Sequence, residues 1–349
     1  MYGSTGIIGY TNSNDYSGER ILIARVGANA GATNIVCGEY GVSDNTLVIT
    51  VNSEYETKYI YYFLKHKKLN QFVFGSGQPL ITGSLLKNIS LYIPDRISQQ
   101  HIAEALSDVD GMISSLEKLI AKYKSIKTAC LQQMFPQNGE TVPRMRLPEF
   151  TGAWKQRKYG EVVETRRGLT YKPSDICDSG IRVLRSSNID EDTFVLKADD
   201  VFVKKDAVNI DYSKENDILI TSANGSTRLV GKHAIISSIS GNPAVHGGFM
   251  LLGTTKEPYF INASMGSSWY RRFIELYVAG GNGAIGNLNK NDLDNQVILI
   301  PSEPEQRAIG AFFKQLDHLI TLHQRKLEKI QKIKQGMMQQ LLTGKIRLM

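Results

Sequence analysis

The chain contains two copies of one distinctive segment, and this repeat restricts its fold more than any other feature. In residues 93–103 and again in residues 300–310, an Ile-Pro pair is followed by glutamine and then isoleucine at the same spacing. Pro94 and Pro301 are 207 residues apart, and the apolar positions that follow them keep the same register at that offset. The pattern predicts one supersecondary unit that occurs twice.

Each copy opens a long amphipathic stretch, residues 95–135 and 301–349. Apolar side chains recur there in alternating steps of three and four, which is the seam of a coiled coil sustained over more than four heptads. About 40 helical residues span roughly 60 Å at 1.5 Å per residue. The residues predicted to pack in the seam are Ile102, Val109, Leu116, Tyr123, Met134, Ile309, Leu316, Leu319, Ile330, Met337 and Leu341.

Two globular parts precede these helices, residues 1–94 and 151–300, and residues 136–150 form a Pro- and Gly-containing linker. Both globular parts are rich in β-type runs between turn residues, which predicts an α+β chain. Helices are predicted at Tyr59 to Phe74 and Ser267 to Tyr277. The predicted strands are Ile21–Ile23, Thr46–Ile49, Ile89–Ile93, Ile181–Leu184, Ile218–Ile220, Ala234–Ile236, Phe249–Leu252 and Val297–Ile300.

The globular parts also match each other. Ile21–Ile23 aligns with Ile218–Ile220 near the start of the shared region. On this alignment the residues equivalent to 151 to about 197 would lie before Met1. The first globular part is therefore expected to be an incomplete copy of the second.

Composition narrows the class of protein. Lys and Arg number 41 against 34 Asp and Glu, a net charge of +7, and this weakly favours a polyanionic partner. The three cysteines, Cys37, Cys130 and Cys177, show no C-x-x-C spacing and are typical of reduced thiols. The N-terminus has no signal-peptide pattern, and no run is long enough to span a membrane. These features predict a cytoplasmic protein.

The helix openings resemble those of the specificity subunits of type I restriction-modification systems. The resemblance covers almost the whole chain, and its specific parts are the two Ile-Pro to Gln-x-x-Ile openings. Further matching segments are the helix endings Cys130–Phe135 and Met338–Gly344, the stretch Arg146–Trp154 before the second globular part, and the loop Val26–Gly31. The departure from the family pattern is the incomplete first domain.

The resemblance implies a fold and a function. The globular parts would be two target-recognition domains, residues 1–94 (incomplete) and 151–300, each reading a half-site on double-stranded DNA. The helices would pack antiparallel as a spacer. The chain would be non-catalytic, would need no cofactor, and would bind two methylation subunits and, through the complex, restriction subunits. The incomplete domain leaves open self-association with a second chain.

Base readout needs side chains that make two hydrogen bonds to a base edge, supported by phosphate contacts. Arg, Asn, Lys and Gln residues in or near turns are the candidates, although for any single one a solvated surface role is the commoner outcome. The predicted DNA-binding residues are Asn12, Arg25, Asn29, Lys58, Gln78, Arg182, Arg185, Asn188, Ser222, Asn224, Arg228, Arg271, Arg272 and Asn282.

The sequence patterns that could indicate an enzyme are weak. Residues 281–286 match G-x-G-x-x-G, but turn residues follow where a helix should begin, so we predict a loop. The spacing Asp44…Glu56-x-Lys58 imitates a nuclease and has no counterpart in the second globular part. His323 lies at a seam position without a second ligand at fitting spacing, which favours a partly buried histidine over a metal site. We therefore predict no catalytic residue and no metal ligand.

Two questions stay open at the level of sequence. The basic residues between Arg325 and Arg347 fit a solvated helix face and a phosphate-facing strip equally well. The chain also fits a coiled-coil scaffold that has lost DNA recognition, which is the alternative to a specificity subunit.

Overall fold

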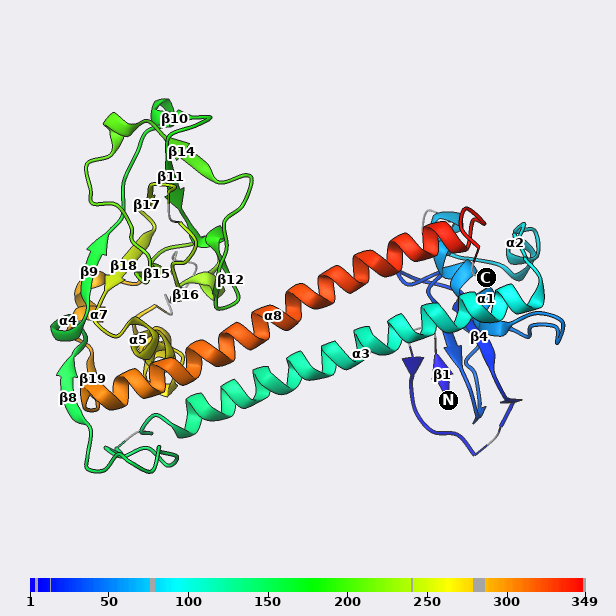
Figure 1. Ribbon diagram of the computed structural model, residues 1–349, viewed down its shortest axis with the longest axis horizontal. Helices are drawn as coiled ribbons and strands as arrows, with labels where there is room; N and C mark the ends of the chain where they lie inside the picture. Colours follow the sequence, from blue (N-terminus) through cyan, green and yellow to red (C-terminus); the bar gives the residue numbers. More distant parts are fainter. Residues whose placement is uncertain are drawn as a thin grey trace. The chain divides into compact units, whose positions relative to one another are not determined.

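A computed structural model gives the structure of the chain and describes residues 1–3, 6–12, 14–75, 79–137, 139–239, 241–278 and 286–347. It divides into two units. Unit 1 comprises Met1–Ile120 with Leu322–Met349, and unit 2 comprises Ala121–Thr321. Each unit therefore contains a segment of both long helices, which carry the labels α3 and α8 (Figure 1). None of the described helices is both long and apolar enough to cross a membrane.

Unit 1 is built on a small antiparallel sheet with strand order β5-β4-β7, beside the pairs β1-β2 and β3-β6. Its elements are β1 Tyr2–Gly3, β2 Gly6–Ile7, β3 Tyr16–Ser17, β4 Arg20–Ala24, β5 Thr33–Val36, β6 Glu39–Tyr40, β7 Thr46–Ile49, α1 Thr57–His66, the 3-10 turn Leu69–Phe72, α2 Gly83–Lys87 and the first part of α3 Arg96–Gln133.

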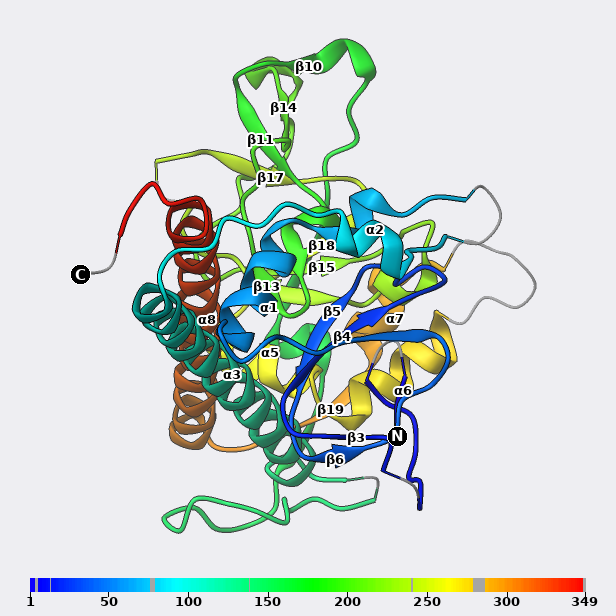
Figure 2. The same cartoon turned by 90° about the vertical axis from the view of Figure 1, so that its right-hand side faces the viewer.

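Strand β4 has a hydrophobic cluster on each face, and its successive side chains point alternately into one and the other. Ile21 and Ile23 pack into the main core with α1, whereas Leu22 faces a second cluster with Val36 and Tyr40. Helix α1 lies against the sheet at β4 and β5 (Figure 2).

Unit 2 contains two four-stranded sheets, β10-β14-β11-β17 and β16-β15-β18-β9, and the pairs β12-β13 and β19-β8. Its strands are β8 Lys155–Lys158, β9 Glu164–Arg167, β10 Ile176–Cys177, β11 Ile181–Leu184, β12 Ile189–Asp190, β13 Thr193–Phe194, β14 Val201–Val203, β15 Ile218–Thr221, β16 His233–Ile235, β17 Ala244–His246, β18 Met250–Thr254 and β19 Val297–Ile300. Its helices are α4 Tyr159–Val162, α5 Pro258–Met265, α6 Ser268–Tyr277, α7 Lys290–Asn295 and the first part of α8 Glu303–Leu341, with 3-10 turns at Pro173–Asp175, Ser186–Asn188, Lys205–Ala207 and Thr227–Leu229.

The same alternation organises the core of unit 2. On β15, Ile218 and Ile220 pack toward α5, α6 and the long helices, whereas Leu219 packs into the cluster that includes Leu184 and Leu252. Strand β15 is flanked by β16 and β18 in the way that β4 is flanked by β5 and β7. The predicted internal repeat is therefore present in the backbone.

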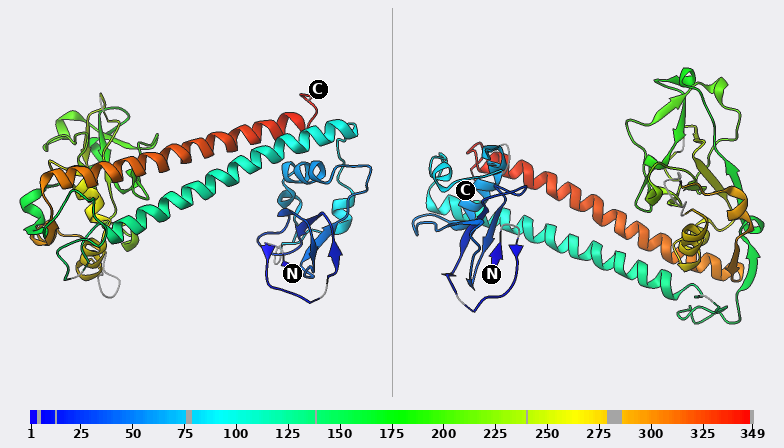
Figure 3. Two further views of the ribbon diagram at one scale, coloured as in Figure 1. Left: turned by 60° about the horizontal axis from the view of Figure 1, so that its bottom comes forward. Right: turned by 180° about the vertical axis from the view of Figure 1, so that it is seen from behind.

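The two long helices were predicted from periodicity and are confirmed. Helices α3 and α8 begin at Arg96 and Glu303, again 207 residues apart. In unit 1 the N-terminal part of α3, with Ile102 and Leu106, shares a core with Leu341 of α8. In unit 2 the C-terminal part of α3, with Cys130, shares a core with Ile309 of α8. The helix segments thus pack antiparallel in each unit (Figure 3).

The glutamine that recurs in both helix openings has a structural role. The Nε2 of Gln99 donates to the carbonyl of Pro94 at 2.9 Å, and the Nε2 of Gln306 donates to the carbonyl of Pro301 at 3.0 Å. Each bond ties the first turn of a long helix to the extended residue before it. The motif is therefore a helix-start motif that the repeat duplicates.

The seam differs from the predicted one in detail. Seven of the predicted residues are buried, namely Ile102, Val109, Leu116, Met134, Ile309, Leu316 and Leu341. Tyr123, Leu319, Ile330 and Met337 are only half-buried. Leu106, Ile120, Phe313 and Ile320 are buried instead. A strict 3.5-residue repeat drifts around a helix of 3.6 residues per turn, so the buried stripe leaves the idealised seam.

Two predicted elements were wrong. The predicted helix Tyr59–Phe74 ends at His66, because Lys68 adopts a left-handed conformation (φ 50°) that a helix cannot contain. The run Ile89–Ile93 forms no strand. Its counterpart in unit 2 is β19, which is held by β8, whereas Ile89–Ile93 has no ladder partner among the described residues. A β-type run becomes a strand only when a second strand pairs with it.

Candidate nucleic-acid interface

Four loops at strand ends in unit 2 line a pocket of about 670 Å³. Leu169–Tyr171 follows β9, Arg185–Ser186 follows β11, Ala223–Gly225 follows β15, and Gly247–Phe249 lies between β17 and β18. Both four-stranded sheets therefore contribute to one concave surface. Side chains on such loops can approach a ligand because the strands behind them are fixed.

Backbone hydrogen bonds hold these loops in place. The amide of Leu169 donates to the carbonyl of His246 at 2.8 Å, and the amide of Gly247 donates to that of Leu184 at 2.9 Å. The first loop approaches the last so closely that a Cβ on Gly168 would lie 2.0 Å from the carbonyl oxygen of Gly247. Glycine is required at position 168 because no side chain fits there.

Two predicted residues, Arg185 and Asn224, lie together in this pocket. The Nδ2 of Asn224 donates to the hydroxyl of Ser186 at 3.0 Å, which joins the second and third loops. Arg185 is half-buried, and its Nε has no hydrogen-bond partner among the described residues. A buried donor without a hydrogen-bond partner, such as this Nε, is costly, so this arginine is suited to receive a ligand.

Two aromatic residues in the pocket were not predicted as site residues. Phe249 is 75% exposed, and although the sequence pattern assigned it to a strand, β18 begins one residue later. Tyr171 lines the same pocket and packs against the cluster that includes Leu169 and Val183. Nothing in a single sequence separates an exposed phenylalanine at a strand end from a buried one.

This combination of groups suits base edges. Arginine can donate two hydrogen bonds to guanine, asparagine can pair with adenine, and an exposed aromatic ring can contact a thymine methyl group. The pocket is therefore chemically able to read a short stretch of base pairs. It offers no acid–base pair of the kind that hydrolysis needs, and among the described residues no three His, Cys, Asp or Glu side chains gather as a metal group.

Three predicted DNA-binding residues have internal partners instead. Arg182 forms an ion pair with the buried Asp200 and lies over the ring of Phe202, 4.6 Å from its centroid. Asn188 is fully buried, and its Nδ2 donates to Asp200 at 2.8 Å. Ser222 is almost buried and donates to the carbonyl of Leu288 at 3.2 Å. We leave these three out of the candidate interface because their polar atoms serve the fold.

The other predicted residues of unit 2 lie apart from the pocket. Arg228 is exposed on a 3-10 turn, and Arg271 and Arg272 are exposed on α6, where Arg272 lines a separate cavity of about 330 Å³. Asn282 lies outside the described residues, as does most of the G-x-G-x-x-G segment.

In unit 1, Arg25 and Asn29 are exposed beside the turn that follows β4. This turn is the counterpart of the loop that carries Asn224. The amide of Arg25 donates to the carbonyl of Asn45 at 2.9 Å, as the amide of Ser222 donates to that of Phe249 in unit 2. The remaining predicted residues Asn12 and Lys58 are exposed, and Gln78 lies outside the described residues.

Acid is expected to lower the unfolding free energy of unit 2 because of His246, which directly precedes the pocket residue Gly247. Burial lowers the pKa of His246 to about 4 from an ordinary 6.5. Between these values the unfolded chain binds a proton that the folded chain does not, so stability is complete above pH 6.5 and falls toward pH 4. The full loss is about 3 kcal/mol, at roughly 1.4 kcal/mol for each pKa unit.

Urea unfolding at several pH values would measure this effect. The chain has two tryptophans, Trp154 and Trp269, and both lie in unit 2, so tryptophan fluorescence reports that unit alone. The His246→Leu variant should lose this part of the pH slope whatever its absolute stability. An identical slope in both proteins would show that His246 is not its source.

Comparisons with known proteins agree with this architecture. The family model described as the type I restriction modification DNA specificity domain matches residues 1–127 and again residues 152–332. The MjaVIII type I restriction enzyme specificity subunit of Methanocaldococcus jannaschii is 26% identical, over 97% of this chain and 80% of its own length. A putative MjaX specificity subunit of the same organism is 23% identical, over 87% and 72%.

Two solved structures share the fold. The S subunit of a type I restriction-modification system from M. genitalium superposes with a TM-score of 0.68, at 15% identity, over 98% of this chain and 87% of that one. A chain from a structural study of complex assembly and conformational transition in the type I system gives a TM-score of 0.51, at 14% identity, over 93% and 81%.

Proposed function

Since this chain belongs to the type I restriction-modification DNA specificity family, we propose that it is the subunit that selects the DNA sequence on which such a complex acts. The observation that carries the proposal is the pocket of unit 2, where Arg185, Asn224 and the exposed Phe249 meet on fixed loops. Its two-point donors and its exposed aromatic ring have the chemistry that reads base-pair edges in double-stranded DNA.

The target is proposed to be bipartite. Two antiparallel strands flank β4 and β15 alike, and a similarly bonded turn follows each, which supports the proposal that each unit reads its own half-site. The long helices would set the number of unread base pairs between the half-sites. Arg25 and Asn29 are the proposed readers in unit 1. Arg228, Arg271 and Arg272 are proposed to contact phosphates, which position a protein without reading sequence.

In this role the chain would be non-catalytic and would work in the cytoplasm. Two methylation subunits would dock on it and modify the DNA, and restriction subunits would join the complex. A scaffold role without DNA recognition is the alternative, and it is an outcome of the following experiment. Self-association through unit 1 would be an additional contact of the chain and not a rival function.

Selection from random double-stranded DNA tests the proposal. The wild-type chain, alone and with its methylation subunit, should enrich two short sequences at a fixed separation. Enrichment of one half-site would assign reading to a single unit. No enrichment in either preparation would contradict the proposal and favour the scaffold.

Arg185→Ala is expected to weaken binding by about 1–3 kcal/mol and to relax the selected sequence at one position, because a base-reading arginine acts on one base pair. Arg271→Ala is the matched control on α6. If Arg271 contacts a phosphate, loss of its side chain should weaken binding to all sequences alike and reduce the salt dependence of binding. If Arg185→Ala also weakened all sequences equally, Arg185 would not be a base reader.

A further inference from the structure

The helix pair contains the same interhelical ion pair twice, with the helices exchanged. In unit 2, the Nζ of Lys127 on α3 lies 2.8 Å from the Oδ1 of Asp317 on α8. In unit 1, the Nζ of Lys334 on α8 lies 2.5 Å from the Oδ1 of Asp110 on α3. Lys127 and Lys334 are 207 residues apart, and so are Asp110 and Asp317. The repeat therefore duplicates one Lys–Asp contact, once in each unit.

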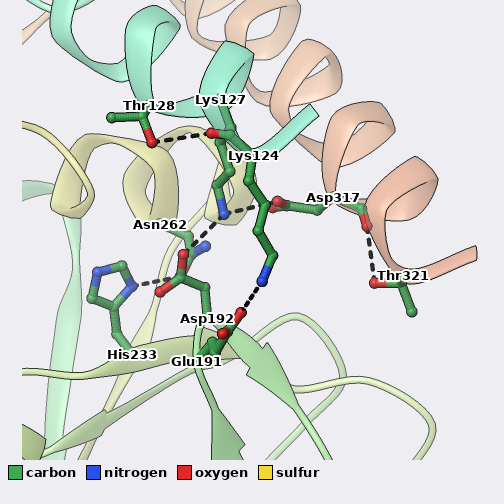
Figure 4. Close-up of polar contacts among 9 residues, drawn as sticks. All are labelled: Lys124, Lys127, Thr128, Glu191, Asp192, His233, Asn262, Asp317 and Thr321. Atoms are coloured by element: carbon green, nitrogen blue, oxygen red, sulfur yellow. Dashed lines mark hydrogen bonds and ion pairs between the residues drawn. The ribbon is translucent and has the colours of Figure 1, made fainter. Parts of the chain in front are cut away.

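In unit 2 this ion pair continues into the globular part. The turn between β12 and β13 brings the Oδ2 of Asp192 to 3.1 Å from the same Nζ of Lys127 (Figure 4). Next to it, the carboxylate of Glu191 lies 2.6 Å from the Nζ of Lys124. Glu191 has a left-handed backbone (φ 52°), which shapes the tight turn that presents both carboxylates to α3. One hairpin is thus fixed to α3 at two lysines.

In unit 1 a different group makes the corresponding connection. The hydroxyl of Tyr62 on α1 donates to the Oδ2 of Asp110 at 2.8 Å, while Lys334 occupies the other carboxylate oxygen. The Nζ of Lys334 also lies 5.4 Å from the centre of the Tyr62 ring. Each unit therefore has a three-part junction that links α3, α8 and the globular part.

We expect these junctions to contribute little to the free energy of unfolding, so their role needs another explanation. The lysine side chains are only 15% and 13% exposed. The pKa shifts in the junction of unit 2 point in both directions: burial raises the pKa of the Asp317 carboxyl, whereas the pKa of Lys127 is raised and that of Asp192 is lowered despite burial, because each lies beside an opposite charge. Replacing a desolvated ion pair by apolar residues often leaves a protein equally stable or makes it more stable. Polar pairs in coiled coils are best attested as devices that fix register and orientation.

We propose that the Lys127–Asp317–Asp192 and Lys334–Asp110–Tyr62 junctions lock each globular part onto the helix pair in one orientation, and thereby fix the number of unread base pairs between the half-sites. This inference rests on the proposed bipartite recognition. One base pair adds about 3.4 Å of rise and roughly a tenth of a helical turn. A reader that rocks on its helix by such an amount would accept neighbouring spacer lengths.

The test is a selection from DNA in which both half-sites are constant and the spacer length varies. The wild-type chain should enrich one length. The double variant Lys127→Met with Asp317→Leu should melt at the wild-type temperature or higher, should keep the half-site sequences, and should enrich neighbouring spacer lengths as well. A purely structural ion pair would lower the melting temperature when removed and leave the spacer distribution unchanged.

Glu191→Gln with Asp192→Asn removes the charges of the hairpin, and so its ion pairs with α3, without altering the helix interface; it serves if the first variant fails to fold. It should broaden the spacer distribution in the same way. Lys122→Met is the matched control, since Lys122 is exposed on α3 and has no carboxylate within ion-pair distance among the described residues. A single unchanged spacer length in both junction variants would overturn the proposal. Failure of the wild-type chain to enrich any bipartite DNA would instead overturn the proposed function.

Discussion

Arg146→Ala is expected to destabilise unit 2 by about 3–5 kcal/mol, because it leaves a buried carboxylate without its partner. The Nε and Nη2 of Arg146 each lie 2.7 Å from an oxygen of Glu305, whose side chain is 2% exposed. The indole nitrogen of Trp154 donates to the same carboxylate at 3.3 Å. This contact fixes the residues before β8 to the first turn of α8. Urea unfolding followed by tryptophan fluorescence measures the loss.

The chain offers a close control for this variant. Arg144 is two residues away and forms an exposed i,i+4 ion pair with Glu140 at 3.2 Å. Exposed pairs contribute little, so Arg144→Ala should change the unfolding free energy by less than about 1 kcal/mol. Equal effects of the two variants would show that burial of Glu305 is not what makes the Arg146 contact strong.

Phe313→Ala is expected to have a similarly large effect, about 3–5 kcal/mol, through the cavity that it creates. Phe313 is 2% exposed on α8 and lies in the main core of unit 2, with its ring centre 6.0 Å from that of Phe135 after the end of α3. Truncation therefore removes one of the packing contacts between α8, the residues that follow α3 and the globular part. The tryptophan-reported transition should shift to lower urea concentration with an unchanged slope.

Gln315→Ala is the matched control for Phe313, because Gln315 is exposed on the same helix two residues away. It should stay within about 0.5 kcal/mol of the wild-type protein. If Phe313→Ala behaved like Gln315→Ala, the helix pair would not contribute to the core of unit 2.

The features predicted correctly from sequence are those that short-range patterns encode. The long helices follow from apolar residues in steps of three and four, and the 207-residue repeat follows from direct comparison of the two openings. Strands such as Ile218–Ile220 were recognisable because their branched residues lie between turn signals. The role of Gln99 and Gln306 was not predictable in detail, but their repetition identified the helix starts.

The candidate site was predicted only in part. Arg182, Arg185 and Asn188 lie within a stretch of seven residues. All three are of types that read DNA bases. Arg185 lines the pocket, whereas Arg182 and Asn188 are bound to Asp200 inside the domain. Whether each side chain is free to bind DNA depends on Asp200, which lies just before β14. The local sequence pattern around residues 182–188 does not contain that information.

The sequence by itself determined the helices, the repeat and the family, because each of these is encoded by residues that are close together or by one segment written twice. Only the tertiary structure decided which polar side chains are available and which are partners of the fold. It alone brought Phe249 and Tyr171 to Arg185, and placed Asp192 beside Lys127. The physical reason is that burial and ion pairing depend on contacts between residues far apart in the chain, and these contacts exist only once the sheets and helices have packed.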